Sequence, residues 1–149
     1  YVKFLEDVIK PRYGEEIVYQ KIPTFRVHLP GNVSVGEYHK DKHYRDVDWA
    51  EKVKETNYYL PLTKAYGTNT IWAETEYGKA DYLPMNADVG DFIMWDGANL
   101  NHGSEHNTTG KSRVSVDFRV LPKSKYQDND MVSTSNKTKM TIGEYWECM

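Results

Sequence analysis

The sequence predicts a mainly β fold, a jelly roll preceded by one short helix. From Glu15 onward the chain consists of short β-like runs separated by Gly, Pro and Asn. No repeated βαβ pattern appears, which favours an antiparallel sandwich or barrel over a parallel sheet. The aromatic residues include twelve Tyr and four Trp, which favour strands and half-wet pockets. About eight short strands suit a jelly roll.

The N-terminal helix is expected within residues 1–10. Leu5, Val8 and Ile9 recur there at helical spacing, and Pro11 closes the segment. One or two further helical turns are expected over Asp48–Lys54. The expected strands share β-branched or aromatic residues between turn-forming residues. They are Ile17–Lys21, Thr24–Leu29, Val33–Tyr38, Asn57–Leu62, Thr70–Thr75, Tyr82–Pro84, Asp91–Trp95 and Arg113–Leu121.

The 149 residues are expected to form a single domain. It divides into a helical remnant over residues 1–14, a jelly-roll core over residues 15–122 and a C-terminal extension over residues 123–149. The extension is polar until Tyr145 and Trp146. We therefore expect a loose segment whose end docks on the core.

Composition narrows the class of partner. The net charge is −3 and the basic residues are scattered, which argues against nucleic acid. Cys148 is the only cysteine, so an internal disulfide framework is excluded and a reducing compartment fits. No apolar stretch is long enough for a membrane span, and the first ten residues lack a secretory pattern. We expect a cytoplasmic protein that acts on a small molecule, without a nucleic acid or a membrane as partner.

The last expected strand alternates strictly between polar and apolar residues. Its polar face carries Arg113, Ser115, Asp117 and Arg119, and its apolar face carries Val114, Val116, Phe118 and Val120. An exposed antiparallel strand gives the same pattern and is by itself the commoner explanation. Arg26 and His28 form a similar polar face on Thr24–Leu29. We interpret both polar faces as lining a wet cavity for anionic groups.

Two histidines and one carboxylate follow one another in the order that a mononuclear iron site requires. His39 and Asp41 lie where a β-like run enters a loop, and they share a face in extended chain. A 2-His-1-carboxylate triad occupies one face of Fe(II) and leaves the other positions open for substrate and O2. The His-x-Asp pattern alone is weak, because it also arises from a surface histidine beside a turn residue.

His102 is the expected third ligand. Gly103 permits close packing beside it, and the run that ends at Trp95 delivers it through a short loop. His106, deeper in a polar turn, is the main alternative for this ligand, and His43 is a further one.

Arg113 follows His102 by eleven residues. A guanidinium matches a carboxylate bidentately, so we expect Arg113 to anchor the far carboxylate of 2-oxoglutarate, although a surface ion pair is the default for any arginine. The residues expected to complete this co-substrate pocket are Ser115, Asn57 and Tyr59. The residues expected to contact the substrate are Arg26, His28, Trp72, Trp95 and Arg119, where wall or core packing is the commoner role of the two tryptophans.

Several segments resemble the non-haem Fe(II), 2-oxoglutarate-dependent dioxygenases. They are Arg26–Asn32, Tyr38–Asp41, Leu60–Thr63, Tyr66–Thr70, His102–Ser104 and Arg113–Arg119. The branch most similar to this chain is that of small streptomycin-biosynthesis-type proteins related to the phytanoyl-CoA dioxygenases. The resemblance covers roughly residues 20–122. It implies a double-stranded β-helix, with His39, Asp41 and His102 as iron ligands and Arg113 as the anchor of 2-oxoglutarate.

The resemblance also implies an activity. The protein would hydroxylate or oxidise a small hydrophilic metabolite with O2, and succinate and CO2 would be the co-products. Most of the N-terminal helical layer of larger members is missing from this chain, which leaves part of the sheet for a partner subunit to cover. Assembly into a homo-oligomer is therefore an open alternative.

Two other classes of protein stay open as well. A non-catalytic jelly-roll binding module would need no metal, and His39, Asp41 and His102 would point apart. A cupin-like metal-dependent isomerase or lyase would use a similar fold without any dependence on 2-oxoglutarate.

Overall fold

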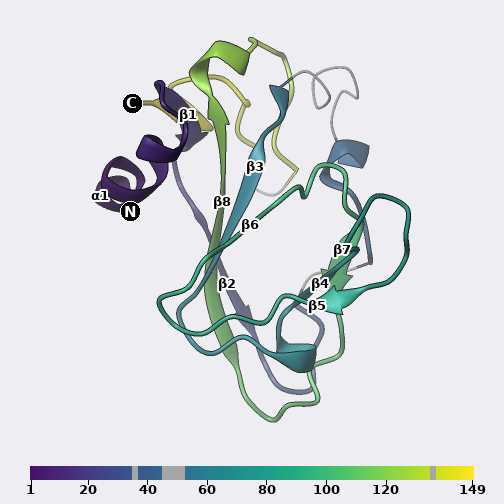
Figure 1. Ribbon diagram of the computed structural model, residues 1–149. Helices are drawn as coiled ribbons and strands as arrows, with labels where there is room; N and C mark the ends of the chain where they lie inside the picture. The colour runs from purple at the N-terminus through teal and green to yellow at the C-terminus, as the bar shows by residue number, and fades with distance from the viewer. Residues whose placement is uncertain (35–36, 45–52, 135–136) are drawn as a thin grey trace.

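The computed structural model describes residues 1–34, 37–44, 53–134 and 137–149. As the sequence predicts, the fold is mostly β, with one short N-terminal helical segment and two antiparallel sheets. The larger sheet has the strand order β6-β3-β8-β1-β9, and β2 also pairs with β8. The smaller sheet has the order β5-β4-β7. Figure 1 shows the two sheets on either side of the interior, as in a β-sandwich or jelly roll.

The strands are short apart from β8. They are β1 (Ile17–Gln20), β2 (Thr24–His28), β3 (Thr56–Pro61), β4 (Ile71–Ala73), β5 (Leu83–Pro84), β6 (Ile93–Trp95), β7 (His102–Ser104), β8 (Arg113–Pro122) and β9 (Trp146–Cys148). Three single 3-10 turns connect some of them: η3 (Asp41–Tyr44), η4 (Gly67–Asn69) and η5 (Lys123–Lys125).

The N-terminal segment forms a continuous helical stretch. It consists of α1 (Val2–Phe4), a π-helical turn η1 (Leu5–Ile9) and a 3-10 turn η2 (Lys10–Arg12). Leu5 and Ile9 are fully buried and pack in one cluster with Tyr58 and Phe118. The helical spacing of the apolar residues therefore marks the side that covers the larger sheet. Among the described residues, no helix combines the length and the apolar character that a membrane crossing needs.

Strand β8 is the centre of the larger sheet (Figure 1). Residues 115–120 of β8 pair with β3 along one edge. Along the other edge, residues 113–117 pair with β2 and residues 120–122 pair with β1. The ten residues of β8 are long enough to hold two shorter strands end to end.

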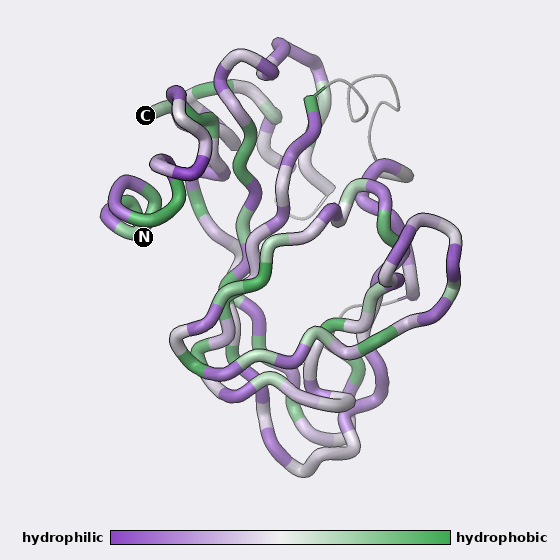
Figure 2. Tube along the Cα trace, in the orientation of Figure 1, coloured by the Kyte–Doolittle hydropathy of each residue, from purple (hydrophilic) through white to green (hydrophobic). Residues whose placement is uncertain are grey.

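The alternation along β8 separates two environments, and Figure 2 shows hydrophilic and hydrophobic residues alternating along the strands. On the inward face, Arg113 and Ser115 are fully buried. On the opposite face, Phe118 and Val120 are buried beneath the N-terminal helical segment. The polar face therefore looks into the molecule, and the exposed-strand explanation of this pattern is wrong.

The segment before His39 differs from its prediction. The described residues of the expected strand Val33–Tyr38 form no strand, and pairing begins only at the bridge between His39 and His102. Tyr38 instead packs over Gly103, where a Cβ atom would lie 3.0 Å from the tyrosine ring. Tyr38 is thus held beside β7 by side-chain packing and not by a ladder of hydrogen bonds. The helical turns expected over Asp48–Lys54 fall mostly outside the described residues.

Two strands go beyond the expected set. β7 contains His102, and β9 belongs to the C-terminal extension. β9 pairs with β1, and Trp146 is fully buried. The end of the extension docks as predicted, and it does so as an edge strand of the larger sheet.

Candidate metal centre

His39, Asp41 and His102 meet in one cluster, although the sequence separates the first two from the third. The backbones of His39 and His102 exchange two hydrogen bonds of 2.9 Å, N to O in both directions. Asp41 begins η3, and its backbone N–H donates to the carbonyl of Gly97 at 3.0 Å. One ligand atom from each residue lies within 4.8 Å of the other two. The backbone pairing thus brings the loop of the first two residues onto β7.

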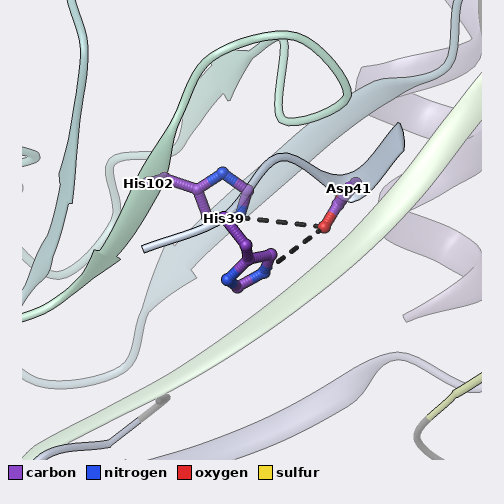
Figure 3. Close-up of side chains that lie close together, drawn as sticks. All are labelled: His39, Asp41 and His102. Atoms are coloured by element: carbon purple, nitrogen blue, oxygen red, sulfur yellow. Dashed lines mark ion pairs between the residues drawn. The ribbon is translucent and has the colours of Figure 1, made fainter. Parts of the chain in front are cut away.

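The ring orientation of both histidines suits a metal. Nδ1 of His39 lies 2.9 Å from the carbonyl of Glu37, and Nδ1 of His102 lies 2.9 Å from the carbonyl of Leu100. A carbonyl oxygen can only accept a hydrogen bond, so each Nδ1 carries the hydrogen and each Nε2 presents a lone pair. Both Nε2 atoms lie 3.7 Å from Oδ1 of Asp41 (Figure 3). A small shift of the side chains would place a metal ion between these three atoms, at metal-to-ligand distances of about 2.0–2.2 Å.

The charge state of the cluster is also suitable. Asp41 and His102 are buried, while His39 is half-buried. Burial lowers the pKa of His102, and this outweighs the opposite effect of Asp41. The neutral imidazole is the form that binds a metal. The residues present therefore fit a divalent cation held by two nitrogens and one oxygen, and they do not point apart as a non-catalytic module would require.

The second oxygen of Asp41 has its own partners. Oδ2 accepts hydrogen bonds from Arg119 Nη2 at 2.6 Å and from Asn57 Nδ2 at 3.1 Å. Sequence reasoning assigns Asn57 to the co-substrate pocket and Arg119 to the substrate. The structure places both side chains against the carboxylate of Asp41.

Glu74 is a residue of the site that sequence reasoning misses. Its carboxylate accepts hydrogen bonds from the backbone N–H groups of Asn101 at 2.8 Å and Ala80 at 3.1 Å. The ammonium of Lys40 lies 3.9 Å from the same carboxylate. Glu74 thus joins the segments that carry His39 and His102. In the sequence, Glu74 is marked only by its place directly after the apolar residues Ile71–Ala73. That it is buried, which would have pointed to a structural role, is visible only in the structure.

A pocket opens beside the cluster, between the two sheets, and this cavity reaches the three side chains. Its lining residues come from both sheets and from the His39 loop. They are Arg26, His39, Asp41, Asn57, Ile71, Trp95, His102, Gly103, Ser104, Asp117 and Arg119. Arg26 and Asp117 form a bidentate ion pair with distances of 2.5 and 3.3 Å. Asp117 and Arg119 of the polar face of β8 therefore line a cavity, as the alternation predicts, whereas Arg113 and Ser115 of the same face are not among its lining residues.

Arg113 is fully buried at the far end of that face. Its Nε donates to the carbonyl of Asn69 at 3.0 Å, and Nη1 donates to Ser115 Oγ at 2.7 Å. The third nitrogen, Nη2, has no hydrogen-bond partner in the described part of the chain. Arg113 is therefore not a surface residue in an exposed ion pair, which is the commonest role of an arginine. It does not line the cavity, and Asp117 is the cavity-lining residue of β8 that lies closest to it in sequence.

Other predicted residues gather around Arg113. The ring of Tyr59 lies 5.7 Å from its guanidinium carbon. His28 is its partner across β2 and β8, and both ring nitrogens of His28 face backbone carbonyls, those of Asn69 and Asn32. His28 is fully buried and does not line the cavity.

The two tryptophans differ in their place. Trp95 lines the cavity and meets His102 edge-on, with ring centroids 4.4 Å apart. Trp72 lies outside the cavity lining, and its indole N–H donates to the carbonyl of Gly67. His106, the rival to His102, is exposed and away from the cluster, and the side chain of His43 lies outside the described part of the chain.

The fold and this cluster define a jelly-roll-like protein in which two histidines and one carboxylate converge. The streptomycin biosynthesis protein StrG of Streptomyces griseus is 45% identical to the chain over 152 residues, which cover 95% of this chain and 70% of StrG. The chain belongs to the StrG family. No protein-family profile matches it.

Solved structures share the fold. The nickel complex of ThoJ, described as a non-heme monooxygenase, matches with a TM-score of 0.58 and 15% identity over 78% of this chain and 49% of ThoJ. AviO1 from Streptomyces viridochromogenes matches with a TM-score of 0.52 and 19% identity over 75% of this chain and 54% of AviO1. The chain thus spans about half the length of these two structures. At such identities the likeness concerns the fold alone.

Proposed function

We propose that this protein is a non-haem Fe(II), 2-oxoglutarate-dependent oxygenase that acts on a small hydrophilic metabolite. The observation that carries the proposal is the convergence of His39, Asp41 and His102 at the wall of a cavity. Two imidazoles and one carboxylate with open positions are the donor set of non-haem Fe(II) oxygenases. When bound, iron and 2-oxoglutarate would supply the oxidation by O2, with succinate and CO2 as co-products, while the protein binds, orients and shields the reactants.

The surroundings of Arg113 support the co-substrate. A buried guanidinium with one unpartnered nitrogen is costly unless an anion reaches it. The carbonyl of Asn69 accepts from Nε of Arg113 and Ser115 Oγ accepts from Nη1, so among the described residues only Nη2 of this guanidinium lacks an acceptor. The far carboxylate of 2-oxoglutarate would supply the missing acceptor, with Ser115 and Tyr59 beside it. Its binding requires the cavity to extend from Asp117 toward Ser115.

The residues that line the cavity and the similar proteins support a small polar metabolite as the substrate. Arg26, Asp117 and Ser104 offer charged and hydroxyl groups, while Trp95 and Ile71 offer apolar surface. StrG is named for the biosynthesis of streptomycin, and ThoJ for monooxygenase activity. We infer that the protein oxidises a small polar metabolite in a biosynthetic pathway. This activity is compatible with a monomer and with a homo-oligomer.

The experiment is a titration of the purified protein under anaerobic conditions. Fe(II) is added first and 2-oxoglutarate second, and each binding step is followed by calorimetry and by the visible charge-transfer absorption of the ternary complex. Exposure to O2 should then produce succinate slowly even without the prime substrate. A folded protein that binds neither Fe(II) nor 2-oxoglutarate refutes the proposal, and Fe(II) binding without 2-oxoglutarate would favour a cupin-like isomerase or lyase.

A matched pair of histidine variants tests the ligand set. His102→Ala should lose Fe(II) binding while the domain stays folded, because one of only three protein ligands is removed. His106→Ala is the control, since His106 is exposed and lies outside the cluster, and it should bind Fe(II) like the wild type. The opposite result, with iron retained in the first variant and lost in the second, would overturn the assignment of His102.

A further inference from the structure

The two oxygens of Asp41 face different surroundings. Oδ1 points toward Nε2 of both His39 and His102, at 3.7 Å from each. Oδ2 takes the hydrogen bonds from Arg119, with Nη2 at 2.6 Å and Nε at 3.3 Å, and from Asn57 Nδ2 at 3.1 Å. The carboxylate is therefore turned so that one oxygen is directed at the histidines and the other at a guanidinium.

Arg119 is itself held from behind by the C-terminal extension. Its Nη1 donates to the hydroxyl of Tyr145 at 3.0 Å, and Nε lies 3.4 Å from Oε1 of Glu55. Tyr145 is buried and directly precedes β9, which pairs with β1. The side chain of Arg119 is only 17% exposed. Contacts on three sides thus fix the direction in which its planar fork of donors points.

Asn57 is held from the opposite side by Gly97. A Cβ atom on Gly97 would lie 2.6 Å from Nδ2 of Asn57, so only glycine lets this amide approach. The carbonyl of the same glycine accepts the backbone N–H of Asp41 at 3.0 Å. Because the carboxylate of Asp41 accepts but does not donate, the amide must present Nδ2 to it.

We propose that Arg119 is a positioning residue of the metal centre: held by Tyr145, it occupies Oδ2 of Asp41 and leaves Oδ1 as the single oxygen that the metal binds. A carboxylate released from Arg119 would rotate and chelate a cation through both oxygens, which takes up a coordination position that a chelating co-substrate needs. The C-terminal extension, far from His39 and Asp41 in the sequence, is thereby part of the metal centre. This inference rests on the metal site of the proposed function and does not depend on 2-oxoglutarate.

The test uses Co(II) as the probe, because its visible absorption reports the number and geometry of its ligands. Calorimetry gives the affinity and the spectrum gives the coordination for Arg119→Met, Arg119→Lys and Tyr145→Phe. Arg26→Met is the matched control, since Arg26 forms a similar bidentate pair with Asp117 in the same cavity but does not touch a ligand. Folding of each variant is checked by near-ultraviolet circular dichroism and thermal melting.

We expect Arg119→Met to weaken Co(II) binding by about 10- to 100-fold, the usual effect of losing a partner of a ligand, and to change the spectrum. Arg119→Lys should restore part of both, Tyr145→Phe should change both in the same direction by less, and the control should match the wild type. Wild-type affinity and spectrum in folded Arg119→Met overturn the inference. Where that variant does not fold, an unchanged spectrum and affinity in both Arg119→Lys and Tyr145→Phe overturn it.

The result is distinct from failure of the proposed function. Wild-type protein that binds no Co(II) refutes the metal site and both ideas together. Wild-type protein that binds Co(II) alongside unaffected variants refutes the role of Arg119 alone. A loss of affinity in the Arg26→Met control as large as that in Arg119→Met also overturns the inference, because it would show that any cavity arginine has the same effect.

Discussion

Replacement of Arg113 by methionine tests the proposed co-substrate site most directly. The guanidinium is fully buried and makes hydrogen bonds of 3.0 Å to the carbonyl of Asn69 and 2.7 Å to Ser115 Oγ, while Nη2 has no partner among the described residues. Methionine keeps the aliphatic volume and removes the charge. The carbonyl of Asn69 keeps His28 Nδ1 at 3.1 Å, so the fold should survive with a loss of about 1–3 kcal/mol.

The expected loss of co-substrate affinity is larger. Truncating one partner of a buried charged pair costs about 2–5 kcal/mol. At about 1.4 kcal/mol per decade, 2-oxoglutarate should bind on the order of 30- to 3,000-fold more weakly. Arg113→Lys should recover only part of this, because a point charge replaces a planar fork. Affinity for Fe(II) should change little, since Arg113 touches none of the three ligands.

The assay is calorimetric titration of 2-oxoglutarate into the anaerobic Fe(II) protein, with Fe(II) affinity measured separately for each variant. Arg119→Met provides the contrast, because it should impair the metal step first. Arg113→Met that binds 2-oxoglutarate as tightly as the wild type would refute the pocket. A larger loss of co-substrate in Arg119→Met than in Arg113→Met, at equal occupancy by Fe(II), would refute it as well.

Two further predictions concern the framework of the site. Hydrogen bonds from the backbone N–H groups of Asn101 and Ala80 lower the pKa of Glu74 below its ordinary value of 4.5, with Lys40 contributing after them. The ionised carboxylate therefore stabilises the fold above about pH 4.5, and this stabilisation is lost as pH falls through the lowered pKa. The difference in melting temperature between wild type and Glu74→Gln should be constant near neutral pH and shrink as the pH falls below about 4.5. A difference that does not vary with pH contradicts the stabilising role of the ionised Glu74 carboxylate. Gly97→Ala should destabilise the protein by about 1–3 kcal/mol in urea denaturation, because its Cβ would lie 2.6 Å from Asn57 Nδ2. Adding Asn57→Ala should recover part of that loss, and a Gly97→Ala protein as stable as the wild type would show that the clash relaxes without cost.

Local patterns were enough for much of the fold. The alternation of Arg113–Val120 predicts β8, since side chains on a strand alternate with period two whatever the strand pairs with. The spacing of Leu5, Val8 and Ile9 likewise predicts the N-terminal helical segment, because helical periodicity is local too. No strand forms in the described residues of the expected strand Val33–Tyr38. Local residue types permit a strand there, but a ladder of hydrogen bonds also needs a partner edge, and in the described residues of this segment the pairing begins at the bridge between His39 and His102.

The sequence by itself determined which residues could form a metal site, through the His-x-Asp pattern and a later histidine followed by an arginine. Only the tertiary structure decided that His39, Asp41 and His102 meet, and that Asn57, Glu74 and Arg119 support them. Asp41 and Arg119 lie 78 residues apart, and no local rule selects that partner. The physical reason is that side-chain periodicity depends on neighbouring backbone angles, whereas the partner of a buried charge depends on which strands the whole sheet brings side by side.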